Sequence, residues 1–248
     1  MSPRMANVWT TRIRALPWGM KELGRALRAL VRGEPSLRDS ALEFAQVQAT
    51  RGDPESVLRA LDRFAREQRF LMNVGDEKGP LLEEIVRSAG PAARILELGS
   101  FVGYSAILMA RHLADGGCVT SIDVKQASSR VSREMAELAG VADRTQFITG
   151  KSSERIDELS APFDVVFLDH WKSLYRSDTE KILERRLLRP NAVVIADNVG
   201  PFFGENDYVA WMQNHPDFDS EYKEARVEYQ NIEDGVLVSR WTRQVAAD

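Results

Sequence analysis

From Arg94 onward, short apolar runs alternate with helical stretches, and this alternation constrains the fold more than any other feature of the chain. Such alternation is typical of βαβ units that build a mostly parallel sheet. Helices are expected near residues 104–114, 126–140, 173–188 and 204–214. The predicted strands are Ile95–Leu98, Val119–Ile122, Gln146–Thr149, Val165–Leu168 and Val193–Ala196.

Two further strands are predicted at the end of the chain, near residues 220–229 and 235–241. The segment Gln230–Asp234 between them is too short for a parallel crossover, which needs about a dozen residues, so the two strands should form an antiparallel hairpin. Five βα units followed by a hairpin predict an open, doubly wound α/β sheet with an antiparallel edge strand. Ligands of such sheets bind at the carboxyl ends of the strands.

Residues 1–33 carry seven basic residues and one acid, a net charge of +6 in a chain whose total is −4. From Trp18 onward the spacing of leucines and basic residues predicts an amphipathic helix. Residues 8–32 can therefore contact an anionic membrane or a protein partner, serve as a transit peptide, or pack on the domain with a solvated basic face. We expect a basic helical extension over residues 1–52 and an α/β domain over residues 53–248.

The composition excludes several classes of protein. A net charge of −4 offers no general attraction for nucleic acid, and no Asn-Pro-Pro-aromatic motif for a flipped base is present. No apolar run reaches the length of about 18 residues that a membrane span needs. The single cysteine, Cys118, rules out an intramolecular disulfide, which fits a reducing compartment. We expect a soluble, cytoplasmic protein, with peripheral membrane association open through the basic helix and the oligomeric state undefined.

A glycine-containing segment, Glu97-Leu-Gly-Ser-Phe-Val-Gly-Tyr-Ser105, follows the first predicted strand and begins a helix. Its G-x-x-x-G spacing differs from the G-x-G-x-x-G that binds a dinucleotide pyrophosphate, which argues against NAD and FAD. Glycines here let the backbone approach a ligand closely, although a structural strand-to-helix turn explains them too. Asp123 ends the second strand and can accept hydrogen bonds from ribose hydroxyls, or it can cap the next helix.

Oxygen ligands follow two further strands. Asp169 follows the fourth predicted strand, and Asp197 and Asn198 follow the fifth. Two carboxylates and an amide oxygen suit Mg²⁺ and do not suit zinc. Lys172 lies three residues beyond Asp169, close enough to act as a base beside a cation. Alternatively, the two acids cap helices and Lys172 is solvated. Trp171 offers a flat apolar wall for an aromatic ring.

Five segments together resemble the catechol O-methyltransferases, which are class I S-adenosylmethionine (SAM)-dependent methyltransferases. The segments are Met72–Gly79, Glu97–Ser105, Phe167–Lys172, Ala196–Asn198 and Val227–Tyr229, and the resemblance covers about residues 53–241. It implies a methyltransferase domain with a seven-stranded sheet, helices on both faces and one antiparallel strand.

The resemblance also implies roles for individual residues. Asp169, Asp197 and Asn198 would hold Mg²⁺, Lys172 would be the catalytic base, and Glu228 would bind the second catechol hydroxyl. The implied SAM contacts are Val74, Glu97, Gly99, Tyr104, Ser105, Asp123, Ser152, Asp169, His170 and Trp171. The implied substrate contacts are Phe70, Trp171, Lys172, Asn198, Pro201 and Glu228.

The chain departs from the family pattern around the substrate mouth. Asp123 replaces the usual glutamate, Phe70 stands where a tryptophan wall is common, and Phe101 replaces a tyrosine. The segment 199–204 is about one residue longer and more aromatic than in the animal enzymes. Two other functions stay open: O-methylation of a different vicinal-diol aromatic, and a non-catalytic cofactor-binding scaffold that uses the N-terminal helix to bind a partner or a membrane.

Overall fold

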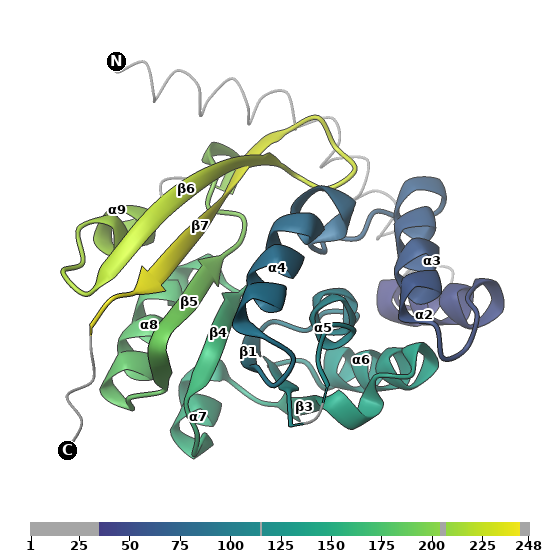
Figure 1. Cartoon of the computed structure of the whole chain (residues 1–248). Helices are drawn as coiled ribbons and strands as arrows, with labels where there is room; N and C mark the ends of the chain where they lie inside the picture. The colour runs from purple at the N-terminus through teal and green to yellow at the C-terminus, as the bar shows by residue number, and fades with distance from the viewer. Residues whose placement is uncertain (1–34, 115, 204–206, 244–248) are drawn as a thin grey trace.

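A computed structural model describes residues 35–114, 116–203 and 207–243, so the basic stripe predicted within residues 8–32 lies outside the described residues. The centre of the described structure is one seven-stranded sheet, with the strands in the order β3-β2-β1-β4-β5-β7-β6 (Figure 1). The predicted strands are all present, with bounds close to those expected. They are β1 Arg94–Leu98, β2 Cys118–Asp123, β3 Thr145–Thr149, β4 Phe163–Leu168, β5 Leu188–Ala196, β6 Phe218–Arg226 and β7 Glu233–Trp241.

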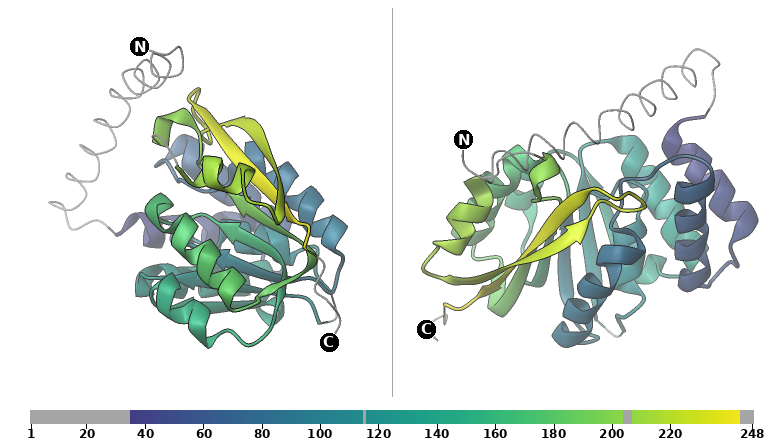
Figure 2. Two further views of the ribbon diagram at one scale, coloured as in Figure 1. Left: turned by 90° about the vertical axis from the view of Figure 1, so that its left-hand side faces the viewer. Right: turned by 90° about the horizontal axis from the view of Figure 1, so that it is seen from above.

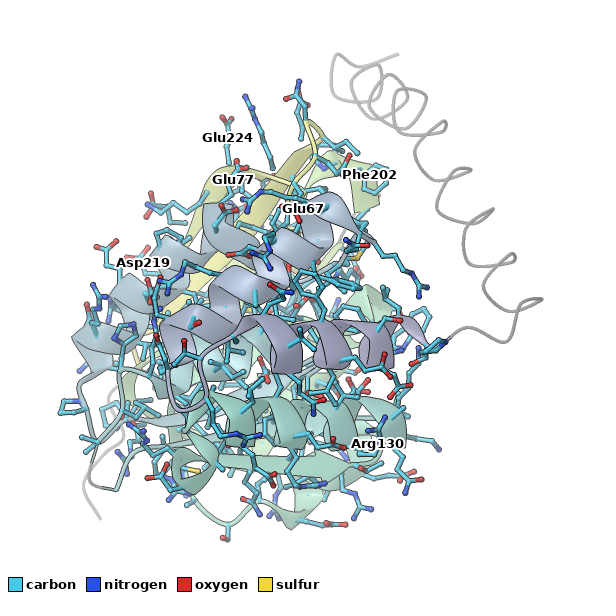
Figure 3. The ribbon with its side chains drawn as sticks, turned by 90° about the vertical axis from the view of Figure 1, so that its right-hand side faces the viewer. Glu67, Glu77, Arg130, Phe202, Asp219 and Glu224 are labelled. Carbon is cyan, nitrogen blue, oxygen red and sulfur yellow. The ribbon has the colours of Figure 1, made fainter. Side chains whose placement is uncertain are left out.

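The antiparallel strand is β7, and it does not lie at the edge of the sheet, contrary to the sequence-based expectation. It pairs antiparallel with β5 on one side and with β6 on the other. The reason is burial: Val236 and Leu237 of β7 contribute to the hydrophobic cores on opposite faces, so this strand must lie inside the sheet. Strand β6 carries exposed charges, which suit an edge strand; Asp219 and Glu224 are labelled on it in Figure 3.

Helices cover both faces of the sheet, as expected for a doubly wound fold (Figure 2). Successive strand residues face opposite cores. Ile95 and Val165 pack with α3–α6, whereas Leu96 and Val166 pack with α8 and α9. The α-helices are α2 Leu37–Gln48, α3 Pro54–Glu67, α4 Gly75–Ala89, α5 Tyr104–Ala110, α6 Gln126–Ala139, α7 Ser152–Arg155, α8 Tyr175–Glu184 and α9 Asp207–Gln213. The 3₁₀ turns are η1 Ala142–Arg144, η2 Ile156–Glu158, η3 Lys172–Leu174 and η4 Pro201–Phe203.

Helix α2 lies within the helical extension expected over residues 1–52 but was not predicted as a separate element, because its buried positions are mostly alanines and give a weak hydrophobic stripe. Ser36 caps it by accepting a hydrogen bond from Asp39 N at 3.2 Å. Its inner face packs into the same core as α3 and α6, and Asp39 forms an ion pair with Arg130 of α6 (Figure 3). The division of the chain at residue 52 stays a prediction. None of the described helices has the length and apolar character needed to cross a membrane.

The packing of α2 can be tested with two substitutions in the same helix. Leu42 is 4% exposed and Val47 is 79% exposed. Leu42→Ala should lower the free energy of unfolding by about 2–5 kcal/mol, because it leaves a cavity in the core. Val47→Ala should change it by less than about 0.5 kcal/mol. Urea denaturation measures both values, and equal effects would show that α2 is not packed on the domain.

Candidate active site

The parallel register of β1, β4 and β5 brings the ends of these strands to one level. Asp169, directly after β4, donates its backbone N–H to Leu98 O at 2.9 Å. Asp197, directly after β5, donates its backbone N–H to Leu168 O at 3.0 Å. The order of strands reverses between β1 and β4, and ligands of doubly wound sheets bind at that point. Both predicted acids therefore lie where a ligand is expected.

The glycines of the 97–105 segment are required by the fold itself. Gly99 has a φ of +107°, and a Cβ at this position would collide with the carbonyl oxygen of Asp169. Gly103, with a φ of +83°, precedes α5 and packs against Ser132 of α6. The close approach that these glycines permit is thus to the protein's own backbone, and the role of Gly99 in binding a cofactor stays a prediction.

Glu97 is fully buried beneath this segment. Its two carboxylate oxygens accept hydrogen bonds from the hydroxyls of Ser105 and Ser121. Burial raises the pKa of Glu97 to about 7, although the two hydrogen bonds oppose the shift. Contact of Glu97 with a cofactor stays a prediction.

Asp123 organises the glycine segment and the start of α6. Its Oδ2 accepts backbone hydrogen bonds from Ser100 and Phe101, each at 3.1 Å, and its Oδ1 accepts from Lys125 N at 2.8 Å. This last bond ends on Lys125, the residue before α6, so Asp123 does not cap an N–H group of the helix itself. Binding of ribose hydroxyls by Asp123 stays a prediction.

Three other predicted cofactor contacts lie around the same edge. Val74 is buried directly before α4, and Ser152 is buried at the start of α7. Burial, and then the charge of Asp62 in α3, raises the pKa of Tyr104. Tyr104 is thus held within the protein, by a partner that no motif indicated.

The predicted metal ligands meet Lys172 after β4 and β5. The Asn198 amide is fixed at both ends: its Nδ2 donates to Asp234 Oδ2 at 2.9 Å, and its Oδ1 accepts from Lys172 Nζ at 3.0 Å. Asn198 N donates to Asp197 Oδ1 at 2.7 Å. Lys172 Nζ lies 3.8 Å from Asp169 Oδ1. The structure therefore brings all four predicted residues together.

Asp169 and Asp197 repel one another across this site. Burial, and then the charge of Asp197, raises the pKa of Asp169 to about 7, while Lys172 and Lys78 oppose the shift. A bound cation would relieve this repulsion, and two carboxylates with an amide oxygen are a donor set that fits Mg²⁺. Among the described residues, no group of three or more His, Cys, Asp or Glu side chains could hold a metal.

Glu228 lies in the link between β6 and β7 and has no exposed surface. Neither of its carboxylate oxygens receives a hydrogen bond within the described part of the chain. Lys78 Nζ lies 2.6 Å from Glu228 Oε1, but off the direction of a hydrogen bond. Gly75, with a φ of +59°, lets α4 begin directly against the Glu228 side chain. Glu228 is thus a buried acceptor that lacks a hydrogen-bond donor.

Lys78 and Asp234 are two buried residues to which the sequence analysis assigned no role. Lys78 Nζ donates to Asp197 Oδ1 and, at 3.0 Å, to Asp234 Oδ2. The attraction of Asp197 and Asp234 raises the pKa of Lys78, although burial alone would lower it. The available signals were a lysine inside the Met72–Gly79 segment and an Asp-Gly pair at the start of the last strand.

His170 and Trp171 lie differently from one another. His170 Nε2 is 2.7 Å from Asp178 Oδ2, and its ring lies 5.3 Å from that of Tyr175. His170 Nδ1 is buried without a partner among the described residues. Trp171 is 67% exposed. His170 is therefore anchored, whereas the indole of Trp171 faces solvent and is free to cover a ligand.

An aromatic cluster, formed by Phe70, Phe202 and Phe203 on Val227 and Ile232, lies apart from the two large cores. Lys172 Nζ is 5.4 Å from the centre of the Phe203 ring, which places the cluster beside the predicted catalytic residues. Phe202, labelled in Figure 3, and Phe203 belong to η4, which begins at Pro201. The predicted substrate contacts Phe70 and Pro201 therefore belong to segments that meet in this cluster.

Known structures share this architecture. The O-methyltransferase TomG of Streptomyces achromogenes, crystallised in complex with SAM, is 24% identical and aligns with a TM-score of 0.66 over 83% of this chain and 96% of its own. The seven-stranded sheet with one antiparallel strand is thus the Rossmann-like fold of methyltransferases, as predicted.

Sequence comparisons define the family. The O-methyltransferase family profile matches residues 48–239. Catechol O-methyltransferase B of Danio rerio is 37% identical over 228 residues, which cover 90% of this chain and 84% of the relative. Catechol O-methyltransferase of Mus musculus is 33% identical over 235 residues, which cover 90% and 88%. The chain therefore belongs to the O-methyltransferase family, and the predicted resemblance to catechol O-methyltransferases is confirmed.

The raised pKa of Glu97 predicts a pH-dependent stability of the cofactor-free protein. Between about pH 4.5 and 7 the folded chain retains a proton that the unfolded chain has released, so stability falls as the pH rises through this window. The shift corresponds to about 3 kcal/mol. Glu97→Gln removes this contribution, so the difference in unfolding free energy, variant minus wild type, should increase from pH 4.5 to 7. Parallel pH curves from urea denaturation would contradict the prediction.

Proposed function

We propose that this enzyme transfers the methyl group of SAM to one hydroxyl of a catechol, with Mg²⁺ as its metal cofactor. The observation that carries the proposal is the convergence of Asp169, Asp197, Asn198 and Lys172 after two neighbouring strands. Catechols present two adjacent oxygens, which suit a cation, a base and a second acceptor within one site. The similarity to relatives named catechol O-methyltransferases supports the same substrate class.

Asp169, Asp197 and Asn198 would hold the metal. When bound, Mg²⁺ supplies a Lewis acid that makes the catechol hydroxyl more acidic. The fixed amide of Asn198 supports this assignment, because its Nδ2 is bound by Asp234 and its oxygen is thereby turned toward Lys172. The protein thus orients the amide before any ligand arrives.

Lys172 would act as the general base. Its Nζ lies within hydrogen-bond distance of Asn198 Oδ1, so a hydroxyl bound beside this oxygen is within reach. Lys172 would accept the hydroxyl proton as the catechol oxygen forms its bond to the methyl carbon. The carbon–sulfur bond would break, and its electron pair would stay on the S-adenosylhomocysteine released. Holding the two reactants at attack distance contributes much of the acceleration.

Glu228 would accept a hydrogen bond from the second hydroxyl of the substrate. A buried carboxylate without a donor is unfavourable, and a catechol supplies the missing donor. A monophenol leaves the carboxylate unsatisfied, which is a strong basis for selection between the two substrates. The aromatic ring would pack against Phe70, Trp171 and Pro201, of which Phe70 belongs to the aromatic cluster.

The cofactor would lie over the ends of β1, β2 and β4. We assign Glu97 to the cationic part of SAM and Asp123 to its ribose, with Trp171 near the adenine. The remaining proposed SAM contacts are Val74, Gly99, Tyr104, Ser105, Ser152, Asp169 and His170.

Three further expectations stay predictions. They are the contact of residues 8–32 with a membrane or a partner, a cytoplasmic location and the absence of nucleic-acid binding.

Turnover should require a hard divalent cation. EDTA should abolish the transfer of labelled methyl from SAM to catechol, and excess Mg²⁺ should restore it. Asp169→Ala should also abolish transfer, because the site loses a carboxylate ligand. The control, Asp143→Ala, removes an acid of η1 whose side chain is 75% exposed and should leave the rate unchanged. Full activity in the presence of the chelator would disprove the metal assignment.

Lys172→Met should lower kcat by about 10²–10⁴-fold, as loss of a general base does, with little change in SAM affinity. The ratio of wild-type to variant kcat should shrink for acidic catechols such as nitrocatechols, because these need less help with deprotonation. Steady-state kinetics across catechols of different acidity measure this ratio. A constant ratio would show that Lys172 orients the ring and does not remove the proton.

A further inference from the structure

Lys78 is a buried cation that the proposed chemistry does not use. It lies in the first turn of α4 and is 3% exposed. Its Nζ contacts three carboxylates that come from three places in the sheet: Asp197 after β5, Glu228 after β6 and Asp234 in β7. One ammonium group therefore joins α4 to the whole antiparallel side of the site.

The three carboxylates are at most 3% exposed. Buried carboxylates are strongly unfavourable without a cation and hydrogen bonds. Within the described residues, Lys78 is the cation that forms ion pairs with all three. It therefore compensates charge at this position before any metal or substrate is bound.

The contacts of Lys78 also determine which carboxylate oxygens of Asp197 and Glu228 stay free for a ligand. On Asp197, the hydrogen bonds from Lys78 Nζ and from Asn198 N both end on Oδ1, which leaves Oδ2 available to an incoming cation. On Glu228, the ammonium lies close to Oε1 but leaves both oxygens without a hydrogen bond. Lys78 thus holds two acids in place without using the oxygens that the reaction needs.

We propose that Lys78 is a positioning residue that acts through Glu228 and Asp197, holding Glu228 against the second hydroxyl of the substrate and Asp197 Oδ2 toward the metal. This inference rests on the proposed function. Lys78 touches neither substrate nor cofactor. Asp234 is its third anchor and ties it to the Asn198 amide.

The test is a double-mutant cycle between Lys78 and Glu228. Lys78→Met keeps an unbranched side chain, one atom shorter, and removes its charge. Alone, it should lower kcat/KM for catechol by about 10- to 100-fold, as loss of a supporting contact does, while the dissociation constant of SAM is unchanged. In a Glu228→Gln background, Lys78→Met should add less than this loss, because one of the acids through which Lys78 acts is already neutral. Lys223→Met, on the exposed edge strand, is the matched control.

A second readout uses the protein without metal, cofactor or substrate. Urea denaturation should show that Lys78→Met destabilises the wild type more than it destabilises Glu228→Gln, because the latter has one buried charge fewer. If Lys78→Met does not fold, Glu228→Gln in the same chain should restore folding. A double variant that fails to fold while Glu228→Gln folds normally would overturn the proposal.

Losses in kcat/KM that multiply in the double variant would also overturn it, because Lys78 would then act independently of Glu228. Failure of the proposed function is recognised separately. In that case the wild-type protein itself does not methylate catechol, whatever the variants do, while the coupling in urea denaturation is still measurable.

Discussion

Compensation of charge at the carboxyl edge of the sheet is the constraint on which the rest of the site depends. Four acids from four segments meet there around two lysines, Lys78 and Lys172. Three of the acids are buried, so helix α4 and the strands can pack only if an ammonium group enters with them. The four acids are Asp169, Asp197, Glu228 and Asp234. The charges that let α4 pack on the sheet are therefore the same ones that form the candidate active site.

Much of the parallel half of the structure was predictable, because strands buried on both faces are continuous apolar runs and polar residues at their ends fall at one edge. The position of β7 inside the sheet was not predictable, because the local sequence pattern does not encode which strands become neighbours. The role of Lys78 was not predictable for a related reason. Its partners Asp197 and Asp234 are 119 and 156 residues away in the sequence. The roles of acids at strand ends are visible in a sequence, whereas the cation that pairs with them is supplied by the tertiary fold.

Three residues beside the site have left-handed backbones although they are not glycines: Phe101, Asn198 and Tyr229, with φ between 48° and 58°. Such conformations are unfavourable and persist where surrounding contacts hold them. Asp123 holds Phe101 through its backbone, Asp234 holds the Asn198 amide, and the Tyr229 hydroxyl donates to Asp62 at 2.7 Å. Each of these residues is thus anchored by a hydrogen bond to a neighbouring carboxylate.

The internal position of β7 has a consequence for how the enzyme matures. Strands β1 to β5 can pair as the chain emerges during synthesis, because each finds its parallel neighbour among earlier or adjacent segments. Among the strands that the structure describes, β6 pairs with β7 alone, so Glu228 has no fixed place until β7 has paired with β5. A nascent chain can therefore form the parallel part of the sheet early, whereas Glu228 is placed only when the last strand pairs. The carboxyl edge of the sheet is therefore completed only when the last strand has been synthesised.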